Sequence, residues 1–213
     1  REMRNTTLWD GAIPNLPPGE TLSETWLLDN VQAIQDRNGI KPRSSELACD
    51  EDMVLEGAGD ESVRYPSFTT EMETGTGKTY VYRRIVPLYH LTYGFSKFVI
   101  VVPSIAIYEG VIKSFKIMKS HFNALYGNEN VHLLEYDSSR MSMLRGFADS
   151  PFVEILVITM HVDKPATWRY SNKIYRPSEQ LPGERKPYEY IQQTRPILIL
   201  DEPQNMESPL SKA

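Results

Sequence analysis

Two short apolar runs of this chain lack the polar alternation of a half-exposed strand. They are Phe98–Val102, which reads FVIVV, and Ile197–Leu200, which reads ILIL. A strand with helices on both of its faces has this composition, and such strands belong mainly to parallel sheets. Because short apolar segments alternate along the chain with stretches of helical periodicity, we expect an α/β fold. Both runs should be central strands of a parallel sheet with helices on both faces.

The expected elements divide the chain at residue 66. Residues 1–66 form an irregular N-terminal region with one capped amphipathic helix at Thr21–Asn38, and residues 67–213 form the α/β domain. Within the first region, Glu46–Glu61 holds seven acids and no base, which predicts a solvated loop rather than a metal or partner site. The expected strands are Phe68–Glu71, Lys97–Val102, Val131–Tyr136, Val153–Met160 and Ile197–Leu200. The expected helices are Thr79–Tyr93, Ser104–His121, Ser138–Ala148 and Pro187–Thr194.

Composition narrows the classes of function. The 213 residues include 23 Lys and Arg against 28 Asp and Glu, a formal net charge of −5, which excludes a uniformly basic nucleic-acid coat but not a local basic groove. Cys49 is the only cysteine, so an internal disulfide and a Cys/His zinc site are excluded. No apolar run approaches the roughly 18 residues of a membrane span, and no leader opens the chain. We expect a cytoplasmic protein without a membrane partner, and the start at Arg1 suggests an excerpt of a longer chain.

A phosphate-binding loop is predicted in the segment METGTGKT, which follows an expected strand and opens an expected helix. Gly75 and Gly77 allow successive backbone N–H groups to turn inward, where the N-terminus of the helix favours an anion. Lys78 is placed to bind the β- and γ-phosphates of ATP, and the Thr79 hydroxyl to bind Mg²⁺. The alternative is a glycine-rich turn without a ligand. The residues expected to bind ATP are Thr74, Gly75, Thr76, Gly77, Lys78 and Thr79.

Acidic residues follow the last expected strand. Leu200 leads directly into Asp201-Glu202-Pro203-Gln204, at the end of a strand where the ligands of open α/β sheets gather. We expect Asp201 to hold Mg²⁺, Glu202 to deprotonate the attacking water and Gln204 to sense the γ-phosphate. An isolated Asp-Glu sequence after a strand usually lies in a solvated turn. Together with the phosphate loop it predicts ATP hydrolysis, with Lys78, Glu202 and Gln204 as the catalytic residues.

These segments resemble the restriction (Res) subunits of type III restriction-modification enzymes, ATP-driven DNA translocases of helicase superfamily 2. Glu71–Tyr82 looks like the extended motif I of that family, Phe98–Gly110 is similar to its motif Ia region, and Asp201–Met206 is similar to its motif II. The resemblance implies the first of two RecA-like P-loop domains, incomplete because it is truncated after motif II, and weak ATP hydrolysis by this chain alone. It also implies Mg²⁺, double-stranded DNA, a separate nuclease domain, and a DNA methyltransferase (Mod) partner that uses S-adenosylmethionine.

Contacts with DNA are expected on weaker grounds. Ser104, which follows Pro103 at the end of a buried strand, either contacts a DNA phosphate, as motif Ia does in related motors, or only caps its helix. Thr159 is a further DNA contact by family analogy alone. The segment His161–Tyr190 mixes six bases with aromatic residues and either follows a DNA strand or anchors a loop to the core. A basic stripe that is better explained as a solvated helix face is formed by Lys113, Lys116 and Lys119.

Three functions are consistent with these observations. The leading hypothesis is an ATP-dependent DNA translocase that supports endonucleolytic cleavage in a restriction system. A second is another superfamily 2 helicase or repair translocase, which the residues beyond Ala213 would distinguish. A third is a nucleotide-dependent docking module without turnover, which should keep its affinity for its partner when Glu202 is replaced by Gln.

Overall fold

The protein is described from a computed structural model, which falls into two compact units. The units are Arg1–Pro18 with Gly77–Ala213, and Gly19–Thr76. The sequence predicts two regions, residues 1–66 and 67–213, and their existence as separate domains stays a prediction. The residues that the structure describes are 11–17, 20–52, 63–73, 75–127, 131–137, 139–159, 174, 178–181 and 186–203.

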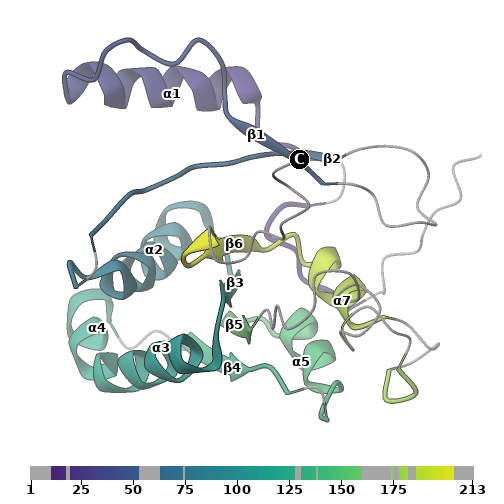
Figure 1. The fold of residues 1–213 in the computed structure, drawn as a ribbon. Helices are drawn as coiled ribbons and strands as arrows, with labels where there is room; N and C mark the ends of the chain where they lie inside the picture. Colours follow the sequence, from purple (N-terminus) through teal and green to yellow (C-terminus); the bar gives the residue numbers. More distant parts are fainter. Residues whose placement is uncertain are drawn as a thin grey trace, which may run out of the picture. The chain divides into compact units, whose positions relative to one another are not determined.

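In the smaller unit, the described residues form helix α1 and the paired strands β1 and β2 (Figure 1). Helix α1 spans Glu24–Arg37 and confirms the predicted helix, with the Ser23 hydroxyl accepting a hydrogen bond from the Trp26 N–H at 3.3 Å. Strand β1 (Cys49–Asp52) pairs antiparallel with β2 (Val63–Pro66). The prediction of a loop is therefore wrong for Cys49–Asp52, because the paired backbone groups satisfy one another whatever the charge of the side chains. Residues 53–62 of the acidic stretch lie outside the described residues.

Residues 67–73 form no strand, so the predicted strand at Phe68–Glu71 is wrong. Phe68 is 62% exposed, and the residues that follow it are two threonines and a glutamate. A strand at the centre of a parallel sheet buries apolar side chains on both faces, which this segment cannot supply. Its prediction depended on its place before the glycine-rich loop rather than on its own composition.

The larger unit is built on a parallel sheet with the strand order β4-β5-β3-β6. Its strands are β3 (Lys97–Val102), β4 (Val131–Glu135), β5 (Val153–Thr159) and β6 (Ile197–Leu200). They confirm four of the predicted strands. Strand β6 is an edge strand among the described residues, where a central strand was predicted, and Leu198 and Leu200 are 52% and 50% exposed. An edge strand that is apolar on both faces fits the expectation of an incomplete sheet.

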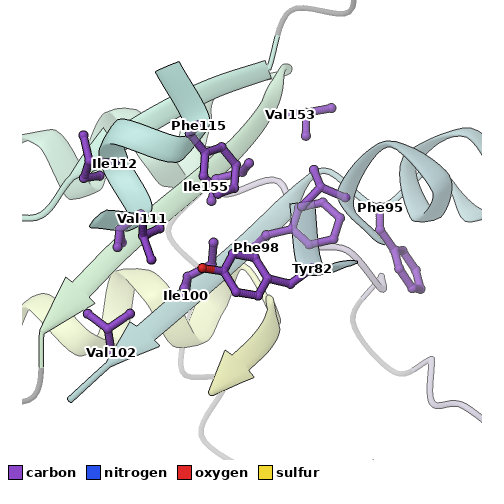
Figure 2. Packing of buried hydrophobic residues seen from close by; sticks show 12 residues of the cluster. Tyr82, Phe95, Phe98, Ile100, Val102, Val111, Ile112, Phe115, Val153 and Ile155 are labelled. Atoms are coloured by element: carbon purple, nitrogen blue, oxygen red, sulfur yellow. The ribbon is translucent and has the colours of Figure 1, made fainter. Parts of the chain in front are cut away.

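Helices cover both faces of this sheet, as predicted (Figure 1). Alternate residues of a strand point to opposite faces. Phe98 and Ile100 of β3 therefore join one buried cluster with α2 and α3 (Figure 2), while Val99 joins a second cluster with α5 and α7. The helices are α2 (Lys78–Tyr93), α3 (Ile105–Ile117), α4 (Lys119–Tyr126), α5 (Met143–Asp149) and α7 (Pro187–Gln193).

Two of these helices are shorter than predicted. The predicted helix at Ser104–His121 is divided at Met118, which separates α3 from α4. Helix α4 brings the ring of Phe122 to 4.7 Å from the Arg83 guanidinium, and the ring of Phe115 on α3 lies 4.6 Å from the same group. Helix α5 begins later than the predicted Ser138, since the Asp137 carboxylate accepts a hydrogen bond from the Ser139 N–H at 2.8 Å, and such local bonds compete with a helix.

Candidate functional site

Lys78 and the acidic residues that follow β6 meet in the larger unit, at the carboxyl end of its sheet. Asp201 directly follows β6, and its N–H donates to the Val101 carbonyl of β3 at 3.0 Å, which extends the pairing of the two strands. Lys78, the first residue of α2, donates from Nζ to Glu202 Oε1 at 3.3 Å. The two side chains are 31% and 29% exposed, so they form a partly buried pair. The structure thus brings the two halves of the predicted site together.

The glycines of the loop have the conformation that the sequence requires of them. Gly77 has φ 96° and ψ 29° at the N-cap of α2, and Gly75 has φ 82°, both in the region that favours glycine. No side chain among the described residues caps α2, so its first N–H groups are available to an anion. In the smaller unit, Thr76 closes a turn by donating from its hydroxyl to the Glu73 carbonyl at 2.6 Å. Thr74 lies outside the described residues.

The acidic tip has a strained backbone and a perturbed carboxyl group. Burial raises the pKa of Asp201, an effect that the charge of Lys78 opposes and the charge of Glu202 reinforces. Glu202 has φ 55°, a conformation that costs a residue other than glycine roughly 1 kcal/mol or more. Residues held in this way are found mainly at functional sites, where the surrounding structure fixes them. Both observations agree with a role of this tip in chemistry.

Tyr82 is a member of the site that the sequence analysis missed. It lies one turn after Thr79 on α2 and is only 6% exposed, and its hydroxyl forms no hydrogen bond of ordinary geometry with any described residue. Burial raises the pKa of Tyr82 to about 12, while the neighbouring Thr79 hydroxyl lowers it and the charge of Asp201 raises it. Thr79 and Tyr82, three residues apart, therefore share one face of α2. An aromatic residue at helical spacing usually belongs to the core, so no sequence pattern signals this role.

The residues present suit a metal-bound nucleotide. The Thr79 hydroxyl and the Asp201 carboxylate are oxygen ligands of the kind that Mg²⁺ prefers. This ion usually takes one or two protein ligands and completes its shell with water and phosphate oxygens, so a larger cluster is not required. The described residues contain no cluster of three or more His, Cys, Asp or Glu side chains that could hold a metal ion. Lys78 is a cation and Glu202 a carboxylate, which are the kinds of group that phosphoryl transfer to water uses.

Some of the other predicted site residues lie outside the described residues, and the rest lie at the carboxyl end of the sheet. Gln204 and most of the segment 161–190 lie outside the described residues. Pro103 and Ser104 follow β3, and Thr159 ends β5, where it pairs with Val102. These residues therefore lie at the same end of the sheet as Asp201, which follows β6. The Ser104 hydroxyl accepts a hydrogen bond from the Ile107 N–H at 3.3 Å and caps α3, which leaves DNA contact a prediction.

The basic stripe on α3 and α4 is exposed, which both a solvated face and a DNA contact require, so the preference for a solvated face stays a prediction. Lys116 is paired with Glu135 at 3.1 Å, and both side chains are largely exposed. Exposed pairs of this kind contribute little to stability and offer no built site. No helix of the described part of the chain has the length and apolar character needed to cross a lipid bilayer.

Comparison with known proteins matches most of this chain to one family. The family model described as type III restriction enzyme, res subunit, matches residues 52–207, which include all the predicted nucleotide-binding and acidic residues. The chain is 32% identical over 151 residues to the Res subunit of the type III enzyme StyLTI from Salmonella typhimurium, covering 62% of this chain and 15% of that protein.

Two further relatives carry the same description. The EcoPI Res subunit of Escherichia phage P1 is 29% identical over 114 residues, which are 53% of this chain and 10% of that protein. The EcoP15I Res subunit of Escherichia coli is 24% identical over 204 residues, which are 87% of this chain and 19% of that protein. The chain therefore spans only 10% to 19% of the length of these relatives.

Proposed function

The chain belongs to the family of type III restriction enzyme Res subunits, and on that premise we propose that it is the first motor domain of an ATP-dependent DNA translocase that supports endonucleolytic cleavage. Domains of this family have a P-loop helicase fold and use a nucleotide and a metal ion. The observation that carries the proposal is the contact between Lys78 and Glu202 at 3.3 Å. It joins the phosphate-binding loop to the acidic tip across 124 residues of sequence.

The proposed reaction is phosphoryl transfer from ATP to water. The Lys78 ammonium and the N–H groups at the start of α2 bind the phosphate oxygens. Thr79 and Asp201 would hold Mg²⁺, which supplies positive charge against the charge that develops on the phosphates. Glu202 accepts the proton of the attacking water, once a triphosphate has drawn Lys78 away from its carboxylate. Gln204 is proposed to sense the γ-phosphate and to report it to neighbouring elements.

The proposed substrate of the motor is double-stranded DNA, and the proposed partner is a DNA methyltransferase (Mod) subunit. The edge of the sheet with Ser104 and Thr159 is the proposed DNA contact, because helix N-termini and hydroxyl groups commonly bind DNA phosphates. S-adenosylmethionine would be used by the partner rather than by this chain. The assembly is proposed to work in the cytoplasm. On its own, this chain should hydrolyse ATP only weakly, since the family resemblance implies a second motor domain outside it.

The test is DNA-stimulated ATPase activity of the full-length protein, with and without its methylating partner. Glu202→Gln should lower phosphate release at least about a hundredfold, since it removes the general base, while binding of the partner is retained. Glu135→Gln is the matched control, because Glu135 is an exposed acid paired with Lys116 and should leave the rate unchanged. A wild-type protein that does not bind ATP would refute the motor. A Glu202→Gln variant with the wild-type rate would remove Glu202 from the chemistry.

A further inference from the structure

The hydroxyl of Tyr82 is a buried polar group without a partner among the described residues. Buried polar groups in proteins are nearly always hydrogen-bonded, and each exception calls for an explanation. A phenylalanine would fill the same space without burying an unpaired oxygen. The packing of the core therefore does not account for a tyrosine at this position.

The ring of Tyr82 is fixed by the core. Figure 2 shows Tyr82 in the buried cluster that includes Phe98 and Phe115, and its ring stacks on that of Phe115 with centroids 6.4 Å apart and planes at 21°. A ring held on its faces by packing leaves its hydroxyl oxygen little freedom of position. The hydroxyl is thus a preorganised hydrogen-bonding group.

The neighbours of this hydroxyl are the two residues that would hold the metal ion. Thr79 lies three residues before Tyr82 on α2, so the two side chains share one face of the helix. The hydroxyl of Thr79 and the charge of Asp201 both act on the Tyr82 phenol. A phenol oxygen can accept a hydrogen bond as well as donate one, so the Tyr82 hydroxyl is able to accept from the Thr79 hydroxyl.

We propose that Tyr82 is a positioning residue of the ATP site: when the metal ion is bound, its hydroxyl oxygen accepts a hydrogen bond from the Thr79 hydroxyl and so directs the Thr79 lone pairs toward the ion. The role rests on the proposed ATPase function. It follows the general pattern in which a group that touches no metal orients one that does. Such partners typically change metal affinity by about 10- to 100-fold when they are removed.

The test is Tyr82→Phe in the full-length protein, which removes one oxygen and keeps the ring. The Mg²⁺ concentration for half-maximal ATPase activity should rise about tenfold, while binding of ATP without Mg²⁺ stays as in the wild type. The denaturant midpoint of the protein without nucleotide should be unchanged or higher, because the variant no longer buries an unpaired hydroxyl. If Tyr82 only supported the fold, its replacement would not raise the Mg²⁺ requirement while leaving stability and Mg²⁺-free ATP binding unchanged.

Tyr136→Phe is the matched control. The Tyr136 hydroxyl is also buried without a partner among the described residues, but its side chain packs on the opposite face of the sheet. This variant should keep the wild-type Mg²⁺ dependence. Equal Mg²⁺ dependence of Tyr82→Phe and the wild type would overturn the role of Tyr82, and so would a loss of activity that only follows a loss of stability. A wild-type protein without ATPase activity would instead overturn the proposed function.

Discussion

Lys78 Nζ lies 3.3 Å from Glu202 Oε1, although 124 residues separate the two in the sequence. Both side chains keep about 30% of their surface exposed, so solvent screens their attraction. Pairs of this kind contribute at most about 1 kcal/mol. A triphosphate with several negative charges can therefore draw Lys78 away at little cost. In the proposed mechanism, occupation of the phosphate loop would draw Lys78 away from the carboxylate that acts as the base.

Lys78→Met should weaken the binding of ATP by about 30- to 100-fold, because it removes charge-assisted hydrogen bonds worth roughly 2–3 kcal/mol. The measurement is titration of the full-length protein with a fluorescent ATP analogue. Lys116→Met is the control, since Lys116 forms an exposed pair with Glu135 away from the loop. Wild-type affinity in the Lys78 variant would contradict the assignment of this loop to phosphate.

Gly77→Ala tests whether the loop needs its left-handed backbone. Gly77 has φ 96° and Gly94 has φ 76°, and neither has a neighbour closer than 3.9 Å to an added Cβ. The substitution at either glycine should therefore cost about 1–2 kcal/mol of backbone strain without a clash. Chemical denaturation should show similar losses of stability for Gly77→Ala and Gly94→Ala. Only Gly77→Ala should weaken ATP binding, and equal affinities in the two variants would mean that the loop does not bind phosphate.

The sequence was sufficient for the bounds of β3 and β6, which the structure confirms to the residue, but not for the place of β6 in the sheet. In a chain with helical stretches between them, apolar runs without polar alternation form few structures other than buried parallel strands. The strand at Phe68–Glu71 was predicted from the loop that follows it, and its polar composition overrules that context.

Contacts between residues that lie far apart in the sequence could not be predicted from it. The Asn15 amide oxygen accepts hydrogen bonds from the Ser96 and Lys97 N–H groups, both at 2.8 Å, which ties the start of the chain to β3. Such a bond across more than 80 residues leaves no local pattern. The placement of Tyr82 beside the site was hidden for a related reason, because the residue also fits the apolar face of α2.

Ser104→Asp separates helix capping from DNA contact. Aspartate caps a helix as well as serine does, so the stability of the variant should match the wild type, while Ser104→Ala should lose about 1 kcal/mol. If the N-terminus of α3 contacts a DNA phosphate, the added carboxylate should lower DNA affinity about tenfold at low salt by repulsion. Ser23→Asp is the control, since Ser23 caps α1 in the same way. Unchanged DNA affinity of Ser104→Asp would leave Ser104 a cap alone.

Lys97 carries a buried ammonium group at the start of β3. The residue is 0% exposed, and Nζ donates to the Ser150 carbonyl at 2.5 Å. Burial lowers the pKa of Lys97 to about 8 from the ordinary value of 10.5, against the opposing charges of Glu154 and Asp149. The folded protein therefore releases this proton at a lower pH than the unfolded chain does. Between about pH 8 and 10.5 the unfolded chain binds more protons, so the free energy of unfolding rises with pH.

Lys97→Met removes this dependence and keeps a side chain of similar length. From pH 7 to pH 9.5, the wild type should gain about 1–2 kcal/mol in free energy of unfolding relative to Lys97→Met, once relaxation around the ammonium is allowed for. Denaturant unfolding of both proteins at the two pH values measures the difference, and the tyrosines and other lysines cancel because both proteins contain them. If the difference between the two proteins stays constant over this range, Lys97 ionises in the folded protein as it does in water.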